Sequence, residues 1–255
     1  MRIASLSPAT TEILFGLGVG KAHEIVCVDQ FSNFPDVAKT LPHLRDHMKV
    51  DPEALKRYQP DIIFTATVIQ EELSKQLKAA GLSVIHQDPR TLHQIYESIF
   101  QIGVLFSLED AARALVLTMQ QGFNDVKRKA IHLIPRPHVY VEEWHDPPYA
   151  SGNWVPEVAR IAGGEQFPIH VGNLSRPVTL EEVEKWNPEL IVISWCGAGL
   201  LAPKDLLLKR TGWDRISAVA QGHVRIIDDS LLNRPGPRLI EGAQRLYGWL
   251  FEMLH

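Results

Sequence analysis

Hydrophobic and polar positions along the chain follow two patterns. Short apolar runs are typical of strands buried on both faces, and longer segments with apolar residues every three or four positions are typical of helices. The predicted strands are 3–6, 24–28, 62–64, 83–86, 138–141, 190–193 and 224–227. The predicted helices are 10–17, 71–80, 92–105, 108–131, 153–162 and 237–254. This alternation predicts an α/β fold with parallel sheets.

One line of sequence occurs twice, as DPEALKRYQPDIIFT at 51–65 and TLEEVEKWNPELIVIS at 179–194. Asp51 and Thr179 suit the N-cap of a helix, because a side-chain oxygen there accepts a bond from an unpaired backbone N–H. In each copy the residue before proline ends the helix, and a buried strand follows. The two copies are separated by about half the chain, which is too long for a solenoid period and predicts two homologous lobes.

A long helix is predicted between the halves. The segment starts after a predicted cap at Ser107, with Asp110 three residues later, and continues to Pro135. We therefore predict an N-terminal α/β lobe over 1–106, a bridging helix over 107–134 and a C-terminal α/β lobe over 135–255. Open α/β sheets bind ligands at the ends of their strands, so we expect the ligand in a cleft between the lobes.

Composition narrows the class of protein. A net charge of −4 and an even spread of the 26 Lys and Arg give no basic field for nucleic acid, so we expect none as a partner. No apolar run approaches the ~20 residues that span a bilayer. The opening MRIASLSP lacks the features of a signal peptide, which indicates a cytoplasmic protein or a removed leader. Two cysteines imply no disulfide framework.

Three motifs with apparent chemistry have simpler interpretations. The glycines at 16, 18 and 20 follow a predicted helix, so we interpret them as its C-cap and turn and not as a dinucleotide loop. His43 and His47 have metal-ligand spacing only on a helix, and the prolines around them favour a loop. Neither Ser7 nor Cys196 lies in a recognisable catalytic motif. We therefore predict no enzymatic activity.

Aromatic residues fall at or just after the predicted strand ends. They are Phe31, Phe34, Trp144, Tyr149 and Trp195. Any one of them can instead be a loop anchor that packs against a neighbouring proline. Together they indicate a wall for a flat, largely apolar ligand such as a corrin or porphyrin ring.

Four segments carry a resemblance to a known family: RIASLSPATTEILFGLG, DPEALKRYQPDII, DPPYASGNWVPEVARIAGG and NRPGPRLIEGAQRL. They resemble the helical-backbone metal-receptor family of ABC-transporter substrate-binding proteins, and within it the cobalamin-binding branch. The resemblance covers nearly the whole chain in order. It implies two Rossmann-like lobes joined by one long helix, the class III periplasmic binding protein fold, and an extracytoplasmic location.

The resemblance also implies roles for single residues. Arg234 matches an arginine three residues before the proline of the family's closing motif, and Asp229 corresponds, one residue out of register, to its acidic partner. Glu53 and Glu181 match glutamates that dock onto the transporter permease. The family's best-known members carry tryptophans where this chain has Ala66 and His47, which leaves the identity of the ligand open.

Two classes of function follow. The first is a binding protein, expected to be a monomer without an intrinsic cofactor, that captures a corrinoid such as cobalamin for an ABC permease. Within this class, haem is the second choice because His47 and Tyr149 offer axial ligands, and a ferric siderophore is the third because Arg45 and Arg234 supply little positive charge. The second class is a cytoplasmic protein that handles cobalamin or another metal complex without a transport role.

Overall fold

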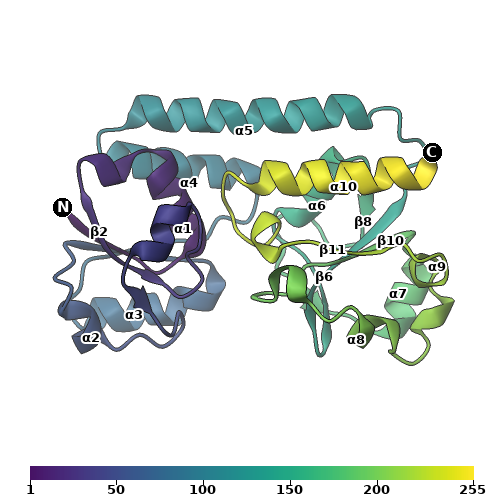
Figure 1. Ribbon diagram of the computed structural model, residues 1–255, viewed down its shortest axis with the longest axis horizontal. Coiled ribbons are helices and arrows are strands. Elements are labelled where there is room, and N and C mark those ends of the chain that lie inside the picture. Colours follow the sequence, from purple (N-terminus) through teal and green to yellow (C-terminus); the bar gives the residue numbers. More distant parts are fainter. The chain divides into compact units, whose positions relative to one another are not determined.

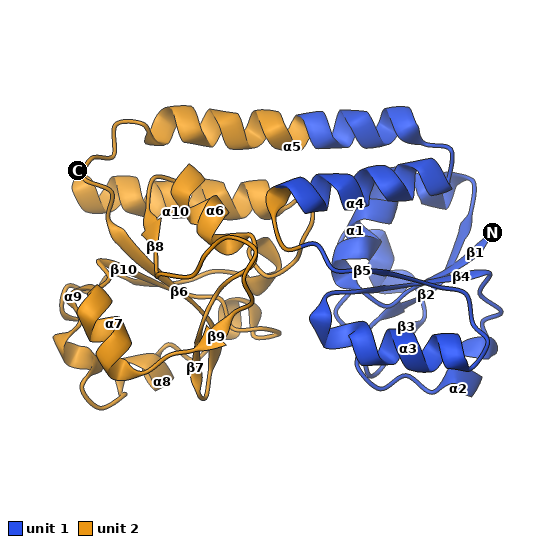
Figure 2. Ribbon diagram, turned by 180° about the vertical axis from the view of Figure 1, so that it is seen from behind, with its two compact units in different colours: residues 1–89, 93–117 blue, residues 90–92, 118–255 orange.

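The computed structural model describes residues 1–255, which form two compact units. Unit 1 comprises Met1–Pro89 and His93–Leu117, and unit 2 comprises Arg90–Leu92 and Thr118–His255 (Figure 2). The division falls inside the helix α5 (Glu109–Ala130), whose residues belong to both units. The sequence-based division instead sets 107–134 apart as a separate segment.

Unit 1 contains a five-stranded sheet in which every neighbouring pair is parallel. Its order is β3-β2-β1-β4-β5, with the strands β1 (Arg2–Ser5), β2 (Glu24–Asp29), β3 (His43–Leu44), β4 (Ile62–Ala66) and β5 (Val84–Gln87). The helices are α1 (Pro8–Gly16), α2 (Pro52–Lys56), α3 (Glu71–Ala79) and α4 (Leu92–Leu105), with the first part of α5.

Helices cover both faces of this sheet. In Figure 1, α1 and α4 lie on one side of the strands and α2 and α3 on the other. The core beneath α2 and α3 joins residues of the strands to the inward faces of these helices. It contains Ala4, Leu6, Val26, Cys27, Val50, Leu55, Ile63, Leu73 and Leu77. Because both faces are covered, the strands are apolar throughout, as the sequence pattern predicts.

Unit 2 contains a mixed six-stranded sheet. Its path is β11-β10-β6-β7-β9, with β8 also paired to β6; the strands are β6 (His138–His145), β7 (Pro148–Ala150), β8 (Glu165–Gln166), β9 (Arg176–Pro177), β10 (Leu190–Ile193) and β11 (Val224–Ile226). The strands β6, β10 and β11 are parallel, whereas β7 returns antiparallel to β6 as a hairpin.

The helices of unit 2 are α6 (Val155–Ile161), α7 (Leu180–Trp186), α8 (Asp205–Leu208), α9 (Ser217–Ala220) and α10 (Leu239–Leu254), with the rest of α5. A core of large side chains, including Tyr140, Ile191, Ile193, Val183 and Trp213, joins β6 and β10 to α7 and its neighbours. Short 3-10 turns connect several elements, and two of them, η3 (Val68–Gln70) and η4 (Gly199–Leu201), follow the strands of the internal repeat.

The two copies of the repeat form the predicted helix and strand. Asp51 Oδ1 accepts from the backbone N–H of Glu53 at 3.0 Å and caps α2. Thr179 and Glu182 form a reciprocal capping box at α7. The predicted cap at Ser107 is wrong, because Ser107 adopts a left-handed conformation with φ 56° and ends α4. No helix in the structure is both long enough and apolar enough to cross a membrane.

Candidate functional site

The carboxyl ends of the parallel strands in unit 1 form one edge of its sheet. The strand order reverses direction between β1 and β4, and ligands of open α/β sheets bind at such a switch point. Ser7 follows β1 and caps α1, and Thr67 follows β4. The loops after β1, β2 and β4 therefore define the candidate site of unit 1.

The loop after β2 carries Phe31 and Phe34. Asp29, which is fully buried, accepts from the Phe31 backbone N–H at 2.7 Å and from Ser32 Oγ at 2.5 Å. Ser32 Oγ also lies 2.8 Å from Thr11 Oγ1 of α1. These bonds fix the start of the loop, while the Phe34 ring is 44% exposed. Phe34 is thus presented to solvent from a braced backbone.

A buried glutamine joins three loops of the same edge. Gln70 Oε1 accepts from the Ala66 backbone N–H at 2.8 Å, and its Nε2 donates to the carbonyls of Leu6 at 2.6 Å and His47 at 2.7 Å. The side chain is 4% exposed, so water does not compete for these bonds. Gln70 therefore sets the relative positions of the loops that follow β1, β3 and β4.

Thr67 has a backbone conformation that side chains rarely adopt. Its φ of 63° and ψ of 160° lie in a region populated almost entirely by glycine, and such residues cluster at functional sites. On the same edge of the sheet, the His47 ring contacts Phe31 edge-on, with the ring centroids 4.9 Å apart. His47 Nδ1 is buried without a hydrogen-bond partner. His43 lies in β3 and His47 lies beyond it, so the two do not form a helical metal pair.

In unit 2, the β6–β7 hairpin presents the aromatic residues Trp144 and Tyr149. These two residues are cross-strand partners, and Trp144 Nε1 donates to the Asp146 carbonyl at 3.0 Å. The Trp144 indole is 42% exposed, and its ring lies 5.0 Å from that of His145. The hairpin was not predicted, and it places Trp144 inside a strand and not after one.

Trp195 occupies a different environment from the one predicted. It is 2% exposed, belongs to the core of unit 2, and donates from Nε1 to Glu142 Oε1 at 2.8 Å. The indole positions the Glu142 carboxylate, and the role of Trp195 in a ligand wall stays a prediction.

Glu142 is the centre of a buried polar cluster below the hairpin. Its carboxylate accepts two bonds from Arg210, at 2.6 and 2.8 Å, and one from Tyr140 Oη at 3.0 Å. Arg210 also donates to the His145 carbonyl at 2.8 Å, and its guanidinium lies over the Trp213 ring. Burial raises the pKa of Glu142, although the bonds from Arg210 act in the opposite direction. This cluster fixes the base of the hairpin.

Arg234 and Asp229 follow β11 at the carboxyl edge of unit 2. Asn233, directly before Arg234, donates from Nδ2 to the Ser194 carbonyl at 2.7 Å. Trp154 Nε1 donates to the Leu232 carbonyl at 2.7 Å. The Asp229 carboxylate accepts from the backbone N–H groups of Gly197 and Gly199 at 3.0 and 2.9 Å, which shows that it orders the loop after β10. The half-buried Arg234 therefore extends from a segment tied at two points.

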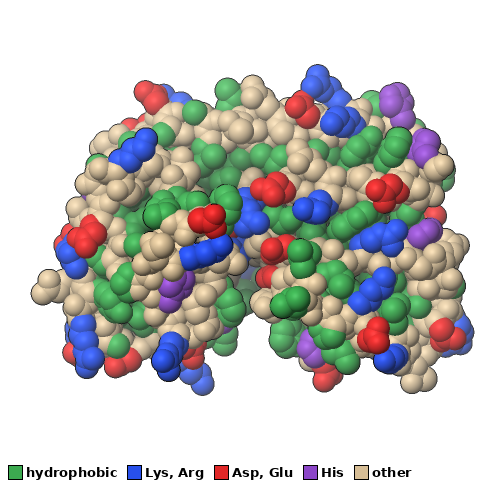
Figure 3. Space-filling view, viewed as in Figure 1, with side chains coloured by type: hydrophobic (Ala, Val, Ile, Leu, Met, Phe, Trp, Pro, Cys, Tyr) green, Lys and Arg blue, Asp and Glu red, His purple; other side chains and the backbone are tan.

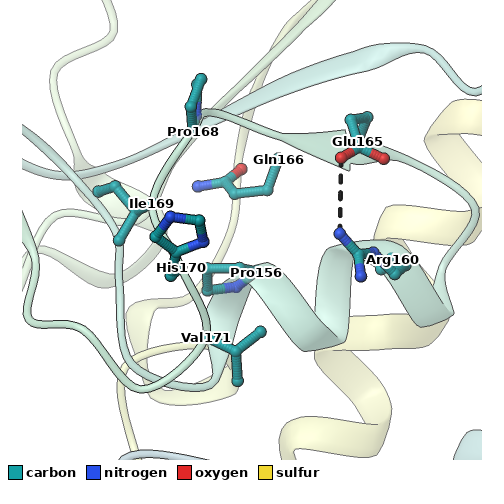
Figure 4. A pocket seen from close by; sticks show the side chains of 8 residues that line it. All are labelled: Pro156, Arg160, Glu165, Gln166, Pro168, Ile169, His170 and Val171. Carbon is teal, nitrogen blue, oxygen red and sulfur yellow. Dashed lines mark ion pairs between the residues drawn. The ribbon is translucent and has the colours of Figure 1, made fainter.

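A pocket with charged lining lies elsewhere in unit 2. Its volume is about 530 Å³, and Figure 4 shows Arg160 of α6 facing Glu165 of β8 at one end. Because β8 pairs with His138 and Val139 at the start of β6, this pocket lies at the amino end of that strand. None of the predicted ligand residues lines it. The pocket is therefore on the edge opposite to the one where open α/β sheets bind ligands.

Charges on the visible surface are mixed. Figure 3 shows Lys and Arg interspersed with Asp and Glu, without a broad region of one sign. No cluster of three or more His, Cys, Asp and Glu side chains is arranged to hold a metal ion. The two carboxyl edges instead combine exposed aromatic rings with fixed polar groups, a combination suited to binding an organic molecule.

Comparison with known proteins identifies the family. The family model described as periplasmic binding protein matches residues 3–231. The chain belongs to the periplasmic binding protein family. An uncharacterised ABC transporter substrate-binding lipoprotein of Bacillus subtilis (strain 168), YvrC, is 31% identical over 96% of this chain and 78% of its own length. The predicted resemblance to ABC-transporter substrate-binding proteins is thereby confirmed.

Two further relatives of this periplasmic binding protein differ in what their names say they bind. A vitamin B12-binding protein of Vibrio cholerae is 24% identical over 98% of the chain and 88% of its own length. The heme-binding protein RhuT from Roseiflexus sp. RS-1 has a TM-score of 0.85 at 23% identity and covers 100% of this chain and 99% of its own. The second similarity confirms the predicted fold class.

Glu53 and Glu181, the residues predicted to dock the permease, lie in the first turns of α2 and α7. The Glu53 side chain is 73% exposed and pairs with Lys56 at 2.7 Å. Glu181 is exposed, and the pKa of its carboxyl is lowered because the Thr179 side chain and a backbone N–H donate to it. Helix N-termini point to the carboxyl edge of a parallel sheet, so each glutamate shares an edge with the ligand candidates of its unit.

Proposed function

We propose that this periplasmic binding protein delivers a corrinoid, with cobalamin as the first candidate, to an ABC importer. The observation that carries the proposal is the similarity to a vitamin B12-binding protein over 98% of the chain. The transport role is supported by the similarity to an ABC transporter substrate-binding lipoprotein. The alternative without a transport role, a cytoplasmic handler of a metal complex, has no comparable support among these relatives.

The proposed contacts come from the carboxyl edge of each unit. Phe31 and Phe34 of unit 1 and Trp144 and Tyr149 of unit 2 offer aromatic surface to the corrin ring. Arg234 offers five N–H donors to the peripheral amides of the ligand. A large ligand with a neutral rim requires apolar walls and a few fixed donors, which is the composition of these edges.

The ligand assignment is tested by visible absorption. The protein is incubated separately with cobalamin, cobinamide, haem and a ferric hydroxamate, then desalted, and its spectrum is recorded. We expect cobalamin or cobinamide to remain bound in a 1:1 ratio. Retention of the hydroxamate alone would show that a siderophore is the substrate, and retention of none at high micromolar concentration would refute the corrinoid assignment.

Haem is the second candidate, and His47 is the residue that favours it. The ring of His47 contacts Phe31, and its Nδ1 is buried without a hydrogen-bond partner, which leaves this nitrogen available as a ligand for iron. If haem is the substrate, we expect His47→Ala to shift the main absorption band of the bound haem. A band that is identical in wild type and variant would exclude His47 as the axial ligand.

For docking, we propose that Glu53 and Glu181 contact basic residues of the permease. A simpler explanation for these two glutamates is that the helix dipole stabilises a carboxylate in the first turn. That explanation predicts no effect of the glutamates on transport. Reversal of both charges, Glu53→Lys and Glu181→Lys, is expected to abolish permease binding while ligand binding and the folded state persist.

The transport role also requires an extracytoplasmic location, which cell fractionation tests. Recovery of the protein in the cytoplasm would favour the alternative without a transport role.

A further inference from the structure

Each unit presents two aliphatic side chains to solvent on a 3-10 turn. In unit 1, the turn η3 exposes Val68 by 39% and Ile69 by 55%. In unit 2, the turn η4 exposes Leu200 by 66% and Leu201 by 91%. We refer to these two pairs as the aliphatic turns. Leu201 is the most exposed large hydrophobic side chain in the structure, so the turns require an explanation beyond ordinary surface variation.

Buried or tied polar groups hold both turns in place. Gln70 ends the first turn and fixes it through bonds to Ala66, Leu6 and His47. The second turn is held by the Asp229 carboxylate, which accepts from the N–H groups of Gly197 and Gly199. The aliphatic side chains are therefore projected from ordered backbone, and little conformational entropy is lost when a partner covers them.

Residues with positive φ lie at or just before the start of each turn. Thr67 has a φ of 63°, and Gly197 and Gly199 have φ values of 77° and 53°. A threonine in this conformation is strained, whereas a glycine is not. In both units the backbone therefore changes direction after an interior strand of the sheet. Positive φ is adopted by a threonine in unit 1 and by two glycines in unit 2.

Each turn follows one copy of the internal repeat. The first follows β4 and the second follows β10, which are the strands that end the two copies. Each turn precedes a helix with acidic residues in its first turn, Glu71 and Glu72 in α3 and Asp205 in α8. The same edges carry Glu53 and Glu181 at the starts of α2 and α7. Each unit therefore carries an aliphatic pair and first-turn carboxylates on the same edge of its sheet.

We propose that the aliphatic turns are a duplicated docking surface for the permease of the importer. The matching surface of the partner is an apolar depression bordered by Lys or Arg, since the carboxylates on the same edge as each turn complement basic residues. A surface that occurs once in each unit suits a partner that presents its own contact twice, such as a two-fold symmetric dimer. This inference rests on the proposed transport function. It extends the proposed permease contact from the two glutamates, Glu53 and Glu181, to a surface that is both apolar and acidic.

The experiment measures permease binding and ligand binding on the same variants. The pairs Val68→Ser with Ile69→Ser and Leu200→Ser with Leu201→Ser are compared with wild type for binding to the importer's permease and ATPase in nanodiscs. The control pair, Ile131→Ser with Ile134→Ser, removes aliphatic groups that are 64% and 79% exposed outside the carboxyl edge. Circular dichroism and thermal melting establish that all variants fold.

We expect each aliphatic-turn pair to weaken permease binding by about tenfold or more, as for central interface residues, with the control unchanged. Because η3 belongs to the loop after β4 at the candidate site, the docking inference requires the loss of permease binding to exceed any loss of ligand affinity in the same variant. Unchanged permease binding in both pairs would overturn the docking inference alone. Loss of ligand affinity with normal permease binding would assign the turns to the ligand site. A wild-type protein that binds no permease would overturn the proposed transport function as well.

Discussion

Arg210 holds the carboxylate of Glu142 with two hydrogen bonds, from Nη1 to Oε2 at 2.6 Å and from Nη2 to Oε1 at 2.8 Å. Glu142 is fully buried, and the Arg210 side chain is only 16% exposed. A third bond from Arg210 reaches the carbonyl of His145, which neighbours Trp144 on the hairpin. One guanidinium thus links the core of unit 2 to the aromatic hairpin at its carboxyl edge.

Replacement of Arg210 by Met should strongly destabilise the protein. The variant leaves a buried carboxylate without its counter-charge, which costs about 3–5 kcal/mol of unfolding free energy. Urea denaturation measures this loss. The control Arg128→Met removes a 79% exposed arginine paired with Asp125, and should change stability by less than about 1 kcal/mol.

The loss caused by Arg210→Met should depend on pH. Burial already raises the pKa of Glu142, and removal of Arg210 raises it further because the charged form loses its partner. The folded variant then binds a proton more tightly than the unfolded chain, so its stability falls as pH rises above the ordinary range of a glutamate. We expect a larger deficit at pH 8 than at pH 5, and a smaller deficit at both when Glu142→Gln is added. An equal deficit at all pH values would contradict this account.

The sequence predicts the regular elements of this fold because burial makes them periodic. The helix over 92–105 is predicted with the observed bounds, and β4 and β10 appear as apolar runs because helices cover both faces of each sheet. The strands β3, β8 and β9 have two residues each, too few for any pattern, and pair with partners distant in the chain. Their existence depends on tertiary contacts, so no periodic pattern in the sequence predicts them.

The candidate site is less predictable, because the hydrogen bonds that hold it join residues far apart in the sequence. Gln70 bonds to Leu6, which is 64 residues away, and Arg210 bonds to Glu142, which is 68 residues away. Trp195 directly follows an apolar strand, but its position in the sequence does not reveal whether its ring faces solvent or the core. Phe31, Phe34 and Trp195 follow strands, whereas Trp144 and Tyr149 lie within the β6–β7 hairpin. The Trp195 ring faces the core, which its place in the sequence does not reveal.

Glu143, like Glu142, has a side-chain carboxyl whose charged form is disfavoured by burial. Burial raises its pKa, although the bond from Ser175 Oγ at 2.5 Å acts in the opposite direction. We expect Glu143→Gln to stabilise the protein at neutral pH, by about 1.4 kcal/mol for each unit of pKa shift that it relieves. The gain should be small below pH 4, where both states of the wild type are protonated, and should grow as pH rises toward the raised pKa.

Thermal denaturation across a pH series tests the Glu143 prediction. Glu252→Gln, at an exposed position in α10, serves as the matched control and should show no comparable rise with pH. If Glu143→Gln lowers stability at pH 7, the hydrogen bond from Ser175 contributes more to the charged form than burial costs it, and our assignment of the dominant effect is wrong.

Gln70→Leu should destabilise the carboxyl edge of unit 1. The variant removes three hydrogen bonds and leaves their backbone partners unsatisfied, which costs roughly 3 kcal/mol at about 1 kcal/mol for each bond. Gln76→Leu on the surface of α3 is the control, since Gln76 makes one long bond of 3.5 Å to Glu72. Hydrogen exchange should show faster exchange of the Ala66 amide in Gln70→Leu alone. Unchanged protection of that amide would show that Gln70 does not hold the loop.

The two tryptophans at the strand ends of unit 2 should separate binding from folding. Trp144→Ala removes a 42% exposed ring, so we expect ligand affinity to fall by about thirtyfold, near 2 kcal/mol, with little loss of stability. Trp195→Phe instead removes the Nε1 donor of Glu142 in the core, so we expect stability to fall by about 1–3 kcal/mol while ligand affinity is nearly unchanged. Calorimetric titration with the retained ligand and urea denaturation on both variants provide the comparison. If Trp195→Phe weakens binding while Trp144→Ala does not, the ligand lies against the core side of the hairpin, and the exposed ring of Trp144 belongs to another contact.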